Sequence, residues 1–257
     1  MKVSVFSVFG GEGAAGSATG VVVLADQPDP SAAQAFATRL GVSDTVFLWP
    51  NGRRWNARFF STLEELAVCY QGLLAAAEVI GAPRSEFICG HDGAARRRVL
   101  PVAREAHHWW VRTPASAVER RGSVPTPFGL GEVIDTGRAR VYLRVEPVGF
   151  ETLQWSATEA REWLRAHALS GLCLVDDATP TRPRLRVFTT SLGGAEDVAT
   201  GGAVVALPDF LGVSTRLEVE QGLGAPSRRG RLVVQGSGPL RLVSGDVLAT
   251  LEGGSSA

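Results

Sequence analysis

Two passages of the chain repeat one layout, and this internal repeat limits the possible fold more than any other feature. Residues 57–81 read ARFFSTLEELAVCYQGLLAAAEVIG, and residues 185–212 read LRVFTTSLGGAEDVATGGAVVALPDFLG. Each passage begins with a strand that carries Arg-x-Phe, passes through a glutamate and ends in an apolar helix. Two copies of one unit that face each other would create one site between them.

The spacing of matched residues supports a duplicated unit. Ser31 begins a predicted helix that ends at Gly41, and Ser156 begins one that ends at Gly171, because serine is a preferred N-cap and glycine a common stop. Each helix is followed by an apolar run and then by a second strand. The matched charged residues are Arg58 with Arg186 and Glu65 with Glu196, at offsets that differ by only a few residues.

In a chain of 257 residues, this duplication predicts two domains. We place the first repeat at residues 1–118 and the second at residues 119–257, with the last strand free to return to the first domain. Residues 112–129, RTPASAVERRGSVPTPFG, contain Pro, Ser and Arg without apolar periodicity. They are therefore predicted to form the linker between the halves.

Composition excludes several classes of function. The 26 Lys and Arg residues balance 26 Asp and Glu residues, so no long-range field attracts nucleic acid or an anionic membrane. Three scattered cysteines are too few for a disulfide framework or a zinc site, which indicates a reducing cytoplasm and no metal. No stretch is long and apolar enough to span a bilayer, and the N-terminus lacks the apolar core of a signal peptide. We expect a soluble, cytoplasmic protein.

Most of the remaining chain is predicted to be strand. The predicted strands are residues 2–9, 20–24, 45–49, 55–60, 107–111, 138–145, 172–175, 185–189, 214–221, 231–235 and 247–251. Gly11, Gly13 and Gly16 spell the dinucleotide fingerprint GxGxxG, but the β-branched segment after them predicts a strand where that site needs a helix. The arginine run at residues 95–98 is interpreted as a solvated face.

The predicted helices after Glu65 and Glu196 are apolar on every face, whereas a surface helix would have one apolar stripe. Each must therefore be enclosed, and a curled sheet would enclose it. The predicted fold is α+β, with two pseudosymmetric β-barrel-like domains that each wrap around a central apolar helix. The N-terminus of such a helix presents unpaired N–H groups, which suit a carboxylate ligand.

Six segments, in order, carry a resemblance to a known family. EDVATGGA, residues 196–203, resembles the EDPATGSA signature of the PhzF-like family of phenazine-biosynthesis isomerases, which have the diaminopimelate epimerase-like fold. The other similar segments are GSATGVVVL (16–24), VSDTVF (42–47), ELAVCYQGLLAAA (65–77), IDTGRARVYLRV (134–145) and QGLGAPSRRGRL (221–232). The resemblance implies an active site in the cleft between two barrels, no cofactor and, commonly, a homodimer.

The chain departs from the family at the residues that carry its chemistry. Asp44 occupies the position of the catalytic glutamate in the motif SETAF, and is shorter by one methylene, about 1.5 Å of reach. Gln71 occupies the position of the family histidine, so an ionisable imidazole is replaced by an amide that only forms hydrogen bonds. Asp197 matches the aspartate of EDPATG, whereas Gly202 replaces its serine.

The resemblance implies two sets of site residues. The catalytic candidates are Asp44, Asp197 and Gln71, and the substrate-binding candidates are Ser43, Tyr70, Cys69, Gly201, Gly202 and Ser17. Some of these residues also have a simpler structural interpretation. An aspartate before a strand also forms turns, acidic residues cap helices, and a cysteine on an apolar helix usually packs in the core. Related epimerases use two opposed cysteines, but Thr200 stands at the second position, which argues against a two-thiol racemase.

The resemblance implies a cofactor-independent isomerase that moves a proton on a small carboxylate-bearing metabolite of specialised metabolism, such as an antibiotic precursor. Asp44 would remove the proton and return it to another carbon of the same π system. Two substrate types remain open, a dihydroaromatic amino acid and a cyclic imine acid. Two other functions also remain open: a non-catalytic ligand-binding or accessory protein, and a cyclase that uses the same cleft for an addition.

Overall fold

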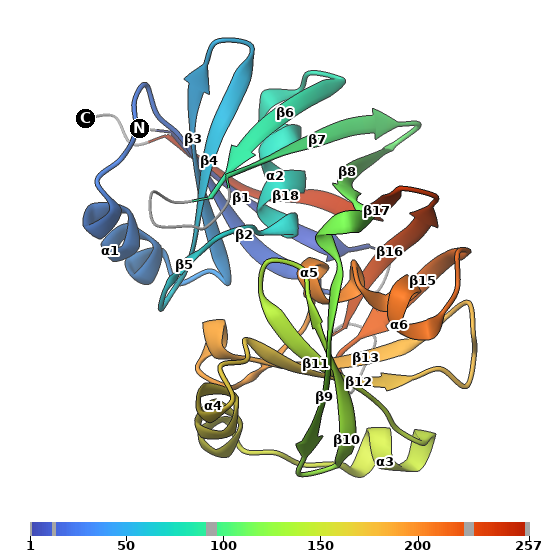
Figure 1. Cartoon of the computed structure of the whole chain (residues 1–257). Coiled ribbons are helices and arrows are strands. Elements are labelled where there is room, and N and C mark those ends of the chain that lie inside the picture. The colour runs from blue at the N-terminus through green and yellow to red at the C-terminus, as the bar shows by residue number, and fades with distance from the viewer. Residues whose placement is uncertain (1, 12–13, 91–96, 224–228, 255–257) are drawn as a thin grey trace.

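The computed structural model describes residues 2–11, 14–90, 97–223 and 229–254. Figure 1 shows that strands make up most of the molecule and that its helices are few and short. The strands are β1 (Lys2–Gly10), β2 (Ser17–Val23), β3 (Asp44–Asn51), β4 (Arg54–Ser61), β5 (Glu65–Leu66), β6 (Arg84–Cys89), β7 (Arg98–Glu105), β8 (His108–Pro114), β9 (Glu119–Thr126), β10 (Gly129–Asp135), β11 (Ala139–Arg144), β12 (Gly171–Asp176), β13 (Arg184–Thr189), β14 (Glu196–Asp197), β15 (Arg216–Gln221), β16 (Gly230–Ser237), β17 (Leu240–Ser244) and β18 (Asp246–Gly254). The helices are α1 (Pro30–Leu40), α2 (Tyr70–Ile80), η1 (Ala115–Ala117), α3 (Pro147–Thr152), α4 (Ala157–Ala166), η2 (Thr190–Leu192), α5 (Gly201–Val204) and α6 (Leu207–Leu211).

The order of strand pairing repeats in the two halves of the chain. In the first half, β2 and β3 pair in parallel across α1, and β4 and β6 pair in parallel across α2. In the second half, β11 and β12 pair in parallel across α3 and α4, and β13 and β15 pair in parallel across α5 and α6. The remaining pairs are antiparallel, and all the described strands join in one 18-stranded sheet. The repeated spacing in the sequence thus corresponds to a repeated topology.

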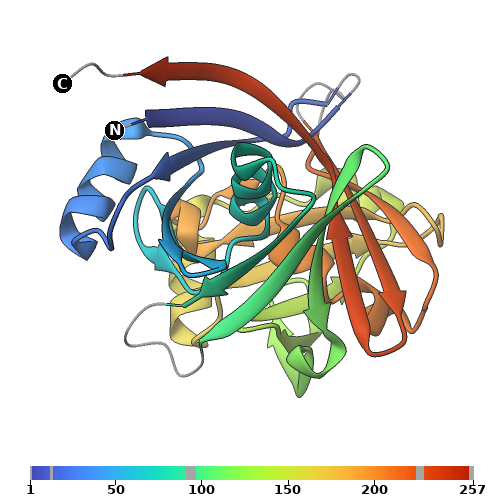
Figure 2. The same ribbon diagram turned by 90° about the horizontal axis from the view of Figure 1, so that it is seen from above.

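Helix α2 lies inside the curved strands of the first half, as Figure 2 shows. It contacts strands from both ends of this half, and every residue from Tyr70 to Ala77 is buried. A helix that is apolar on all faces is stable in water only when it is covered in this way. The predicted enclosure is therefore observed for α2, whereas the complete arrangement of two barrels remains a prediction.

The second apolar passage differs from the prediction of one helix, because it forms two short helices. Glu196 and Asp197 form the two-residue strand β14 against β13, and the helical part begins only at Gly201. Pro208 then lies in the first turn of α6, where proline starts a helix but cannot continue one from the preceding turn. Both short helices pack against β16, and α5 contacts α2.

The other two helix predictions needed smaller corrections. Helix α1 begins at Pro30, because Asp29 is its N-cap and accepts a hydrogen bond from the Ala32 N–H at 2.8 Å. Ser156 does cap α4, with a full capping box, but α4 ends at Ala166 and the Gly171 stop was wrong. Ala168 turns the chain out of the helix with a φ of 53°, before Gly171 begins β12.

The segment predicted to be a linker is ordered strand. Most of residues 112–129 belong to β8, η1 and β9, and β9 pairs with β10 along most of its length. Ion pairs join Arg120 to Glu132 at 2.5 Å and Arg121 to Asp135 at 2.6 Å. A strand with this much charge has no apolar alternation, so the sequence pattern did not indicate it. The boundary at residue 118 remains a prediction.

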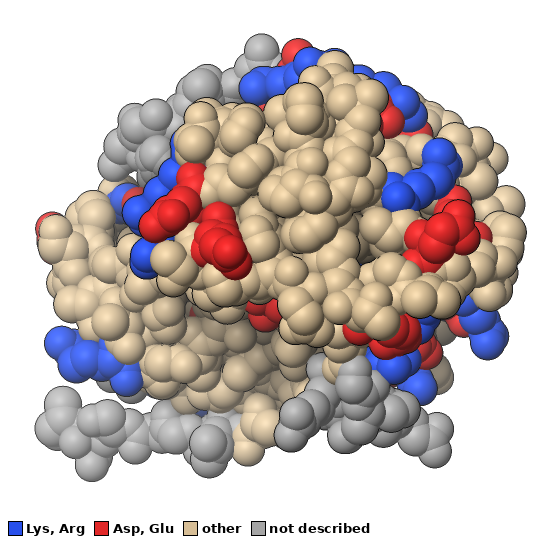
Figure 3. Space-filling view, turned by 90° about the horizontal axis from the view of Figure 1, so that it is seen from below, with Lys and Arg blue, Asp and Glu red and all other residues tan. Residues whose placement is uncertain are grey.

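The end of the described chain returns to its beginning. Strand β18 pairs with β1 over Lys2 to Gly10, and β17 pairs with β8. Figure 2 shows β18 lying alongside β1 above α2. No helix among the described residues is long and apolar enough to cross a membrane. On the face seen in Figure 3, acidic and basic side chains are interspersed among uncharged ones.

Candidate active site

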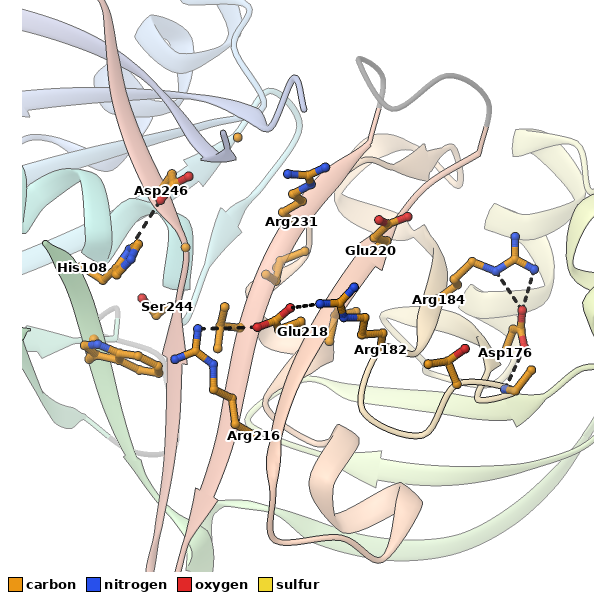
Figure 4. A pocket seen from close by; sticks show the side chains of 18 residues that line it. His108, Asp176, Arg182, Arg184, Arg216, Glu218, Glu220, Arg231, Ser244 and Asp246 are labelled. Atoms are coloured by element: carbon orange, nitrogen blue, oxygen red, sulfur yellow. Dashed lines mark hydrogen bonds and ion pairs between the residues drawn. The ribbon is translucent and has the colours of Figure 1, made fainter. Parts of the chain in front are cut away.

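Two cavities of the protein differ in how many of their charged lining side chains form ion pairs. The larger, of about 650 Å³, is lined by β15, β16 and neighbouring strands and is shown in Figure 4. Its charged side chains pair with one another: Arg184 with Asp176 at 2.5 Å, Arg182 with Glu218 at 3.5 Å, and His108 with Asp246 at 3.4 Å. None of the predicted site residues lines it. Most of these charges have partners within the protein, although Arg231 forms no ion pair among the described residues, and with no predicted site residue in its lining this cavity is not where we place the site.

The smaller cavity, of about 350 Å³, lies where the starts of the two central helices meet. Tyr70 at the start of α2 and Gly202 at the start of α5 both line it. The other lining residues are Ala67, Val68, Arg98, Ser116, Ala117, Glu119, Arg121, Asp135, Thr136, Gly137, Arg138 and Arg140. Residues from both repeats therefore form this cavity, as the sequence analysis predicts for the site.

Asp44, Cys69 and Asp197 come together from three separate elements; Cys69 directly precedes Tyr70 of the cavity wall, but none of the three lines the cavity itself. Asp44 begins β3, Cys69 is the N-cap of α2, and Asp197 ends β14. The Cys69 thiol lies within hydrogen-bonding reach of the Asp44 carboxyl, and the charge of Asp197 acts on both groups. Cys69 also accepts a hydrogen bond from the Gly72 N–H at 3.3 Å, so its sulfur is held between the helix start and Asp44.

The environment of Asp44 favours its protonated form. Burial is the largest cause and the negative charge of Asp197 adds to it, so the pKa of Asp44 rises from 3.8 to about 7. The hydrogen bond with Cys69 and the positive charge of Arg138 act in the opposite direction but do not prevail. Burial likewise raises the pKa of Cys69 well above its usual value, so this thiol stays protonated at neutral pH.

Asp197 is held by the turn that leads into α5. The Thr200 hydroxyl donates to its carboxylate at 2.6 Å, and the Ala199 N–H donates at 3.4 Å. Gln221 fixes the same turn, because its amide nitrogen donates to the carbonyl of Asp197 and its amide oxygen accepts from the Thr200 N–H. Burial raises the pKa of Asp197 in spite of these bonds. Asp197 thus both caps the turn and faces Asp44.

The two matched glutamates have a structural role. Arg58 donates to both carboxylate oxygens of Glu65 at 2.6 and 2.7 Å. Arg186 makes the corresponding pair with Glu196 at 2.9 Å. Each pair ties a two-residue strand to the long strand before it, and so fixes the chain that leads to the start of a central helix.

Gln71 and Ser17 lie in contact beneath this cluster. The Gln71 amide donates to the hydroxyls of Ser17 at 3.3 Å and Thr19 at 3.1 Å, and all three residues are buried. Thr19 is the strand partner of Asp44 in the β2–β3 pair. Gln71 therefore ties α2 to the strand that supports Asp44, while Ser43 lies partly buried just before β3.

Of the remaining predicted residues, Tyr70 and Gly202 line the cavity, whereas Gly201 packs behind its wall against Tyr70. Tyr70 directs its hydroxyl to Thr113 on β8 at 2.9 Å, and burial raises the pKa of this phenol. A Cβ added at Gly201 would lie 2.5 Å from the Cβ of Tyr70, and one at Gly202 would lie 3.1 Å from the guanidinium of Arg140. Only glycine allows α5 to approach α2 and Arg140 so closely.

Four arginines at the candidate site were not predicted from the sequence. Arg98, Arg121, Arg138 and Arg140 all line the smaller cavity. The interpretation of residues 95–98 as a solvated face is wrong for Arg98, while residues 95 and 96 lie outside the described part of the chain. Arg138 and Arg140 are two apart near the start of β11, and side chains at that spacing share one face of a strand. This spacing, within IDTGRARVYLRV, was the available signal.

Comparison with known proteins supports the same family. A family model described as phenazine biosynthesis-like protein matches residues 6–87. No curated protein matches the chain. The solved structure of a PhzF-family phenazine biosynthesis protein from Enterococcus faecalis superposes with a TM-score of 0.74 at 17% identity, and covers 100% of both chains. A predicted epimerase from Pseudomonas aeruginosa gives 0.76 at 21% identity, covering 98% of each chain.

A more distant structure has the same fold. A hydroxyproline epimerase from Agrobacterium vitis, solved with trans-4-hydroxy-L-proline, gives a TM-score of 0.62 at 12% identity and covers 97% of this chain and 89% of its own. These likenesses show the epimerase-like fold. The resemblance to the PhzF-like family is confirmed, because the family model and the solved structures agree with the motifs.

Proposed function

From this resemblance, we propose that the protein is a cofactor-independent isomerase that moves a proton on a small carboxylate-bearing metabolite of specialised metabolism. The observation that carries the proposal is the pKa of Asp44, which burial and the charge of Asp197 raise to about 7, with the Cys69 thiol in hydrogen-bonding reach. A group with this pKa is present in both protonation states at neutral pH, as a group that alternates between base and acid must be.

The proposed reaction needs one acid/base group. The ionised Asp44 takes a proton from a carbon next to an unsaturated or carbonyl-activated carbon, and the electron pair enters the π system. The neutral Asp44 then gives the proton to another carbon of that system, which restores the carboxylate and leaves the atoms of the substrate unchanged in number. Asp197 assists the first step, because its negative charge favours the protonated form of Asp44.

Other groups of the site would hold the substrate. The backbone N–H groups at the start of α2 point outward from the helix and provide donors for delocalised negative charge. Gln71 acts through Ser17 and Thr19, and so keeps β2 and β3 in place behind Asp44. Thr200 donates its hydroxyl to Asp197. Because this hydroxyl does not act as an acid/base near neutral pH, Asp44 is the single acid/base group of the proposal. A dihydroaromatic amino acid and a cyclic imine acid are both suitable substrates for this chemistry.

Solvent deuterium exchange tests the proposal directly. Candidate acids that bind the protein are incubated in D₂O, and NMR follows deuterium at each carbon. We expect exchange with the wild type and a loss of about 100-fold or more with Asp44→Asn, because the amide cannot accept the proton. Asp177→Asn is the matched control, since Asp177 is an exposed carboxylate paired with Arg144.

Each alternative function gives a different result. A non-catalytic binding protein would exchange no carbon-bound proton in any ligand that it binds tightly, and that result would end the isomerase proposal. A cyclase would give a product with a changed ring count. If Asp44→Asn exchanges as fast as the wild type, the isomerase stands but another group is the base.

A further inference from the structure

We propose that Arg98 and Arg140 together form an oxyanion-binding site in the smaller cavity, which holds the carboxylate or a phosphate group of the substrate. This assignment rests on the proposed function for the identity of the ligand as a substrate. The arginine pair itself is defined by the structure, and its binding of anions can be measured without turnover.

The four arginines that line the cavity fall into two pairs. Arg121 is paired with Asp135 at 2.6 Å, and Arg138 is paired with Glu64 at 2.6 Å. Arg98 and Arg140 have no carboxylate within 4.0 Å among the described residues. Their protein partners are carbonyls and one hydroxyl, which accept hydrogen bonds but bring no negative charge. Arginine remains charged at any physiological pH, so both positive charges lack an ion-pair partner, and the negative charge that acts on Arg140 is that of Asp197.

The lack of an ion-pair partner is clearest at Arg140, because only 7% of this residue is exposed to solvent. Its Nη1 atom donates to the carbonyls of Gly202 at 3.2 Å and Arg138 at 3.4 Å, and to the Thr136 hydroxyl at 3.4 Å. Its buried Nε atom has no hydrogen-bond partner within the described part of the protein. A buried guanidinium with an unused donor and no ion-pair partner is unfavourable in the free protein. An anion entering the cavity would supply the missing partner.

Arg98 converges on the same point from β7. Its Nη1 atom donates to the carbonyl of Thr136 at 2.9 Å, so Thr136 contacts both guanidiniums. The charges of Arg98 and Arg140 both act on the Tyr70 hydroxyl and lower its pKa against the larger effect of burial. The two cations therefore lie on the same side of the α2 N-terminus, whose dipole adds positive potential.

Two glycines leave room for the arginine pair. A Cβ at Gly137 would lie 3.2 Å from the guanidinium of Arg98, and Gly137 also has a φ of 101°, which favours glycine. A Cβ at Gly202 would lie 3.1 Å from Nη2 of Arg140. Gly202 is the position where the family signature has serine, so the loss of that serine and the presence of Arg140 are sterically linked.

The position of Arg98 and Arg140 brings a bound anion near the two aspartates of the proposed reaction. Arg138 lies two residues before Arg140, and its charge acts on Asp44. Arg140 acts in the same way on Asp197. An oxyanion held by Arg98 and Arg140 therefore keeps the body of a small acid next to the two aspartates.

Binding of three probes tests the site by calorimetry: pyrrole-2-carboxylate, its neutral analogue pyrrole-2-carboxamide, and inorganic phosphate. We expect the wild type to bind the carboxylate at least 10-fold more tightly than the carboxamide. Arg140→Gln and Arg98→Gln should each weaken carboxylate binding by about 10-fold or more, with little effect on the carboxamide. Arg54→Gln, which removes an exposed arginine paired with Glu86, is the control.

Two further measurements distinguish binding from a structural role. Gly202→Ser should weaken carboxylate binding as Arg140→Gln does, because the added side chain displaces the guanidinium. Arg140→Met should raise or preserve the melting temperature, since it removes a buried charge that has no ion-pair partner. A large fall in melting temperature together with unchanged anion binding by Arg140→Gln would show that Arg140 only supports the fold.

The outcomes separate the anion site from the proposed reaction. Phosphate binding that depends on both arginines and exceeds carboxylate binding would identify a phosphorylated ligand at the same site. Failure of the wild type to bind either the carboxylate or phosphate, or equal affinity of Arg140→Gln and wild type, would overturn the site. Arginine-dependent binding without deuterium exchange would retain the anion site and remove only the isomerase.

Discussion

The ionised carboxylate of Asp44 destabilises the folded protein. The pKa of a carboxyl in the unfolded chain is near 3.8, and in the folded protein burial and Asp197 raise it to about 7. Between these values the folded state binds more protons than the unfolded state, so stability falls as the pH rises. The cost is absent below about pH 4 and fully present above about pH 7. The proposed catalytic role and stability therefore oppose each other at this residue.

We predict that Asp44→Asn stabilises the protein by about 1–3 kcal/mol at pH 8, because the amide is neutral at every pH. The gain should be smaller at pH 5, where the folded wild type is already protonated. Urea denaturation at both pH values measures the difference. Equal gains at pH 5 and pH 8 would mean that the carboxyl of Asp44 is not perturbed.

The sequence located the acidic residues of the site better than the basic ones. Asp44, Cys69 and Asp197 come from separate motifs, and the family order placed them together before any distance was known. Arg98 lies outside the segments that resemble the family, and Arg140 lies in the segment 134–145 without being a candidate site residue; the importance of both depends on which carboxylates form no ion pair with them. Pairing across a fold cannot be read from one-dimensional spacing, so the anion site could not be predicted.

At the scale of elements, the repeated ion pairs connect each short strand to its neighbour. Arg186 is 2% exposed and donates to Glu196 as well as to the carbonyls of Phe150 and Leu153, both at 2.8 Å. Its removal would leave a partly buried carboxylate and two carbonyls without their donor. Such losses are among the most destabilising single changes.

We predict that Arg186→Ala lowers the free energy of unfolding by about 3–5 kcal/mol. The matched control is Arg54→Ala, which breaks the exposed pair with Glu86 and should cost less than about 1 kcal/mol. Thermal or urea denaturation of both variants gives the comparison. Similar losses from the two variants would contradict a structural role for the buried pair.

Element prediction succeeded where one chemical signal dominated. The apolar surface of α2 on all sides predicted its enclosure, and Ser156 as an N-cap residue predicted the start of α4. Strand β9 was missed because its stability comes from ion pairs to β10, which leave no apolar alternation. The second central helix was predicted too long, because apolar content outweighed the effect of Pro208.

At the scale of the whole molecule, backbone hydrogen bonds join the two repeats. The second repeat supplies β17, which pairs with β8, and the same strand continues into β18 beside β1. Sequence repetition alone predicted two units and allowed the last strand to return. It could not show that β17 also pairs with the first half, because strand partners depend on the closed sheet.

We predict a single cooperative unfolding transition, because neither half retains all its strand partners when the other unfolds. Tryptophan fluorescence and far-ultraviolet circular dichroism should give coincident urea curves. Two separated transitions would show that the repeats are energetically independent. Light scattering during size-exclusion chromatography should be recorded in parallel, since we also expect a homodimer and dissociation would add a concentration-dependent step.

The pairing of β18 with β1 also has a consequence for synthesis on the ribosome. Thr250 donates its hydroxyl to the carbonyl of Val5, a contact between residues 245 positions apart. Strand β1 is translated long before β18, so one of its edges stays unpaired until β18 has been made. An open strand edge invites pairing with other chains. We therefore expect the yield of native protein in cells to depend on translation speed and on chaperones that cover this edge.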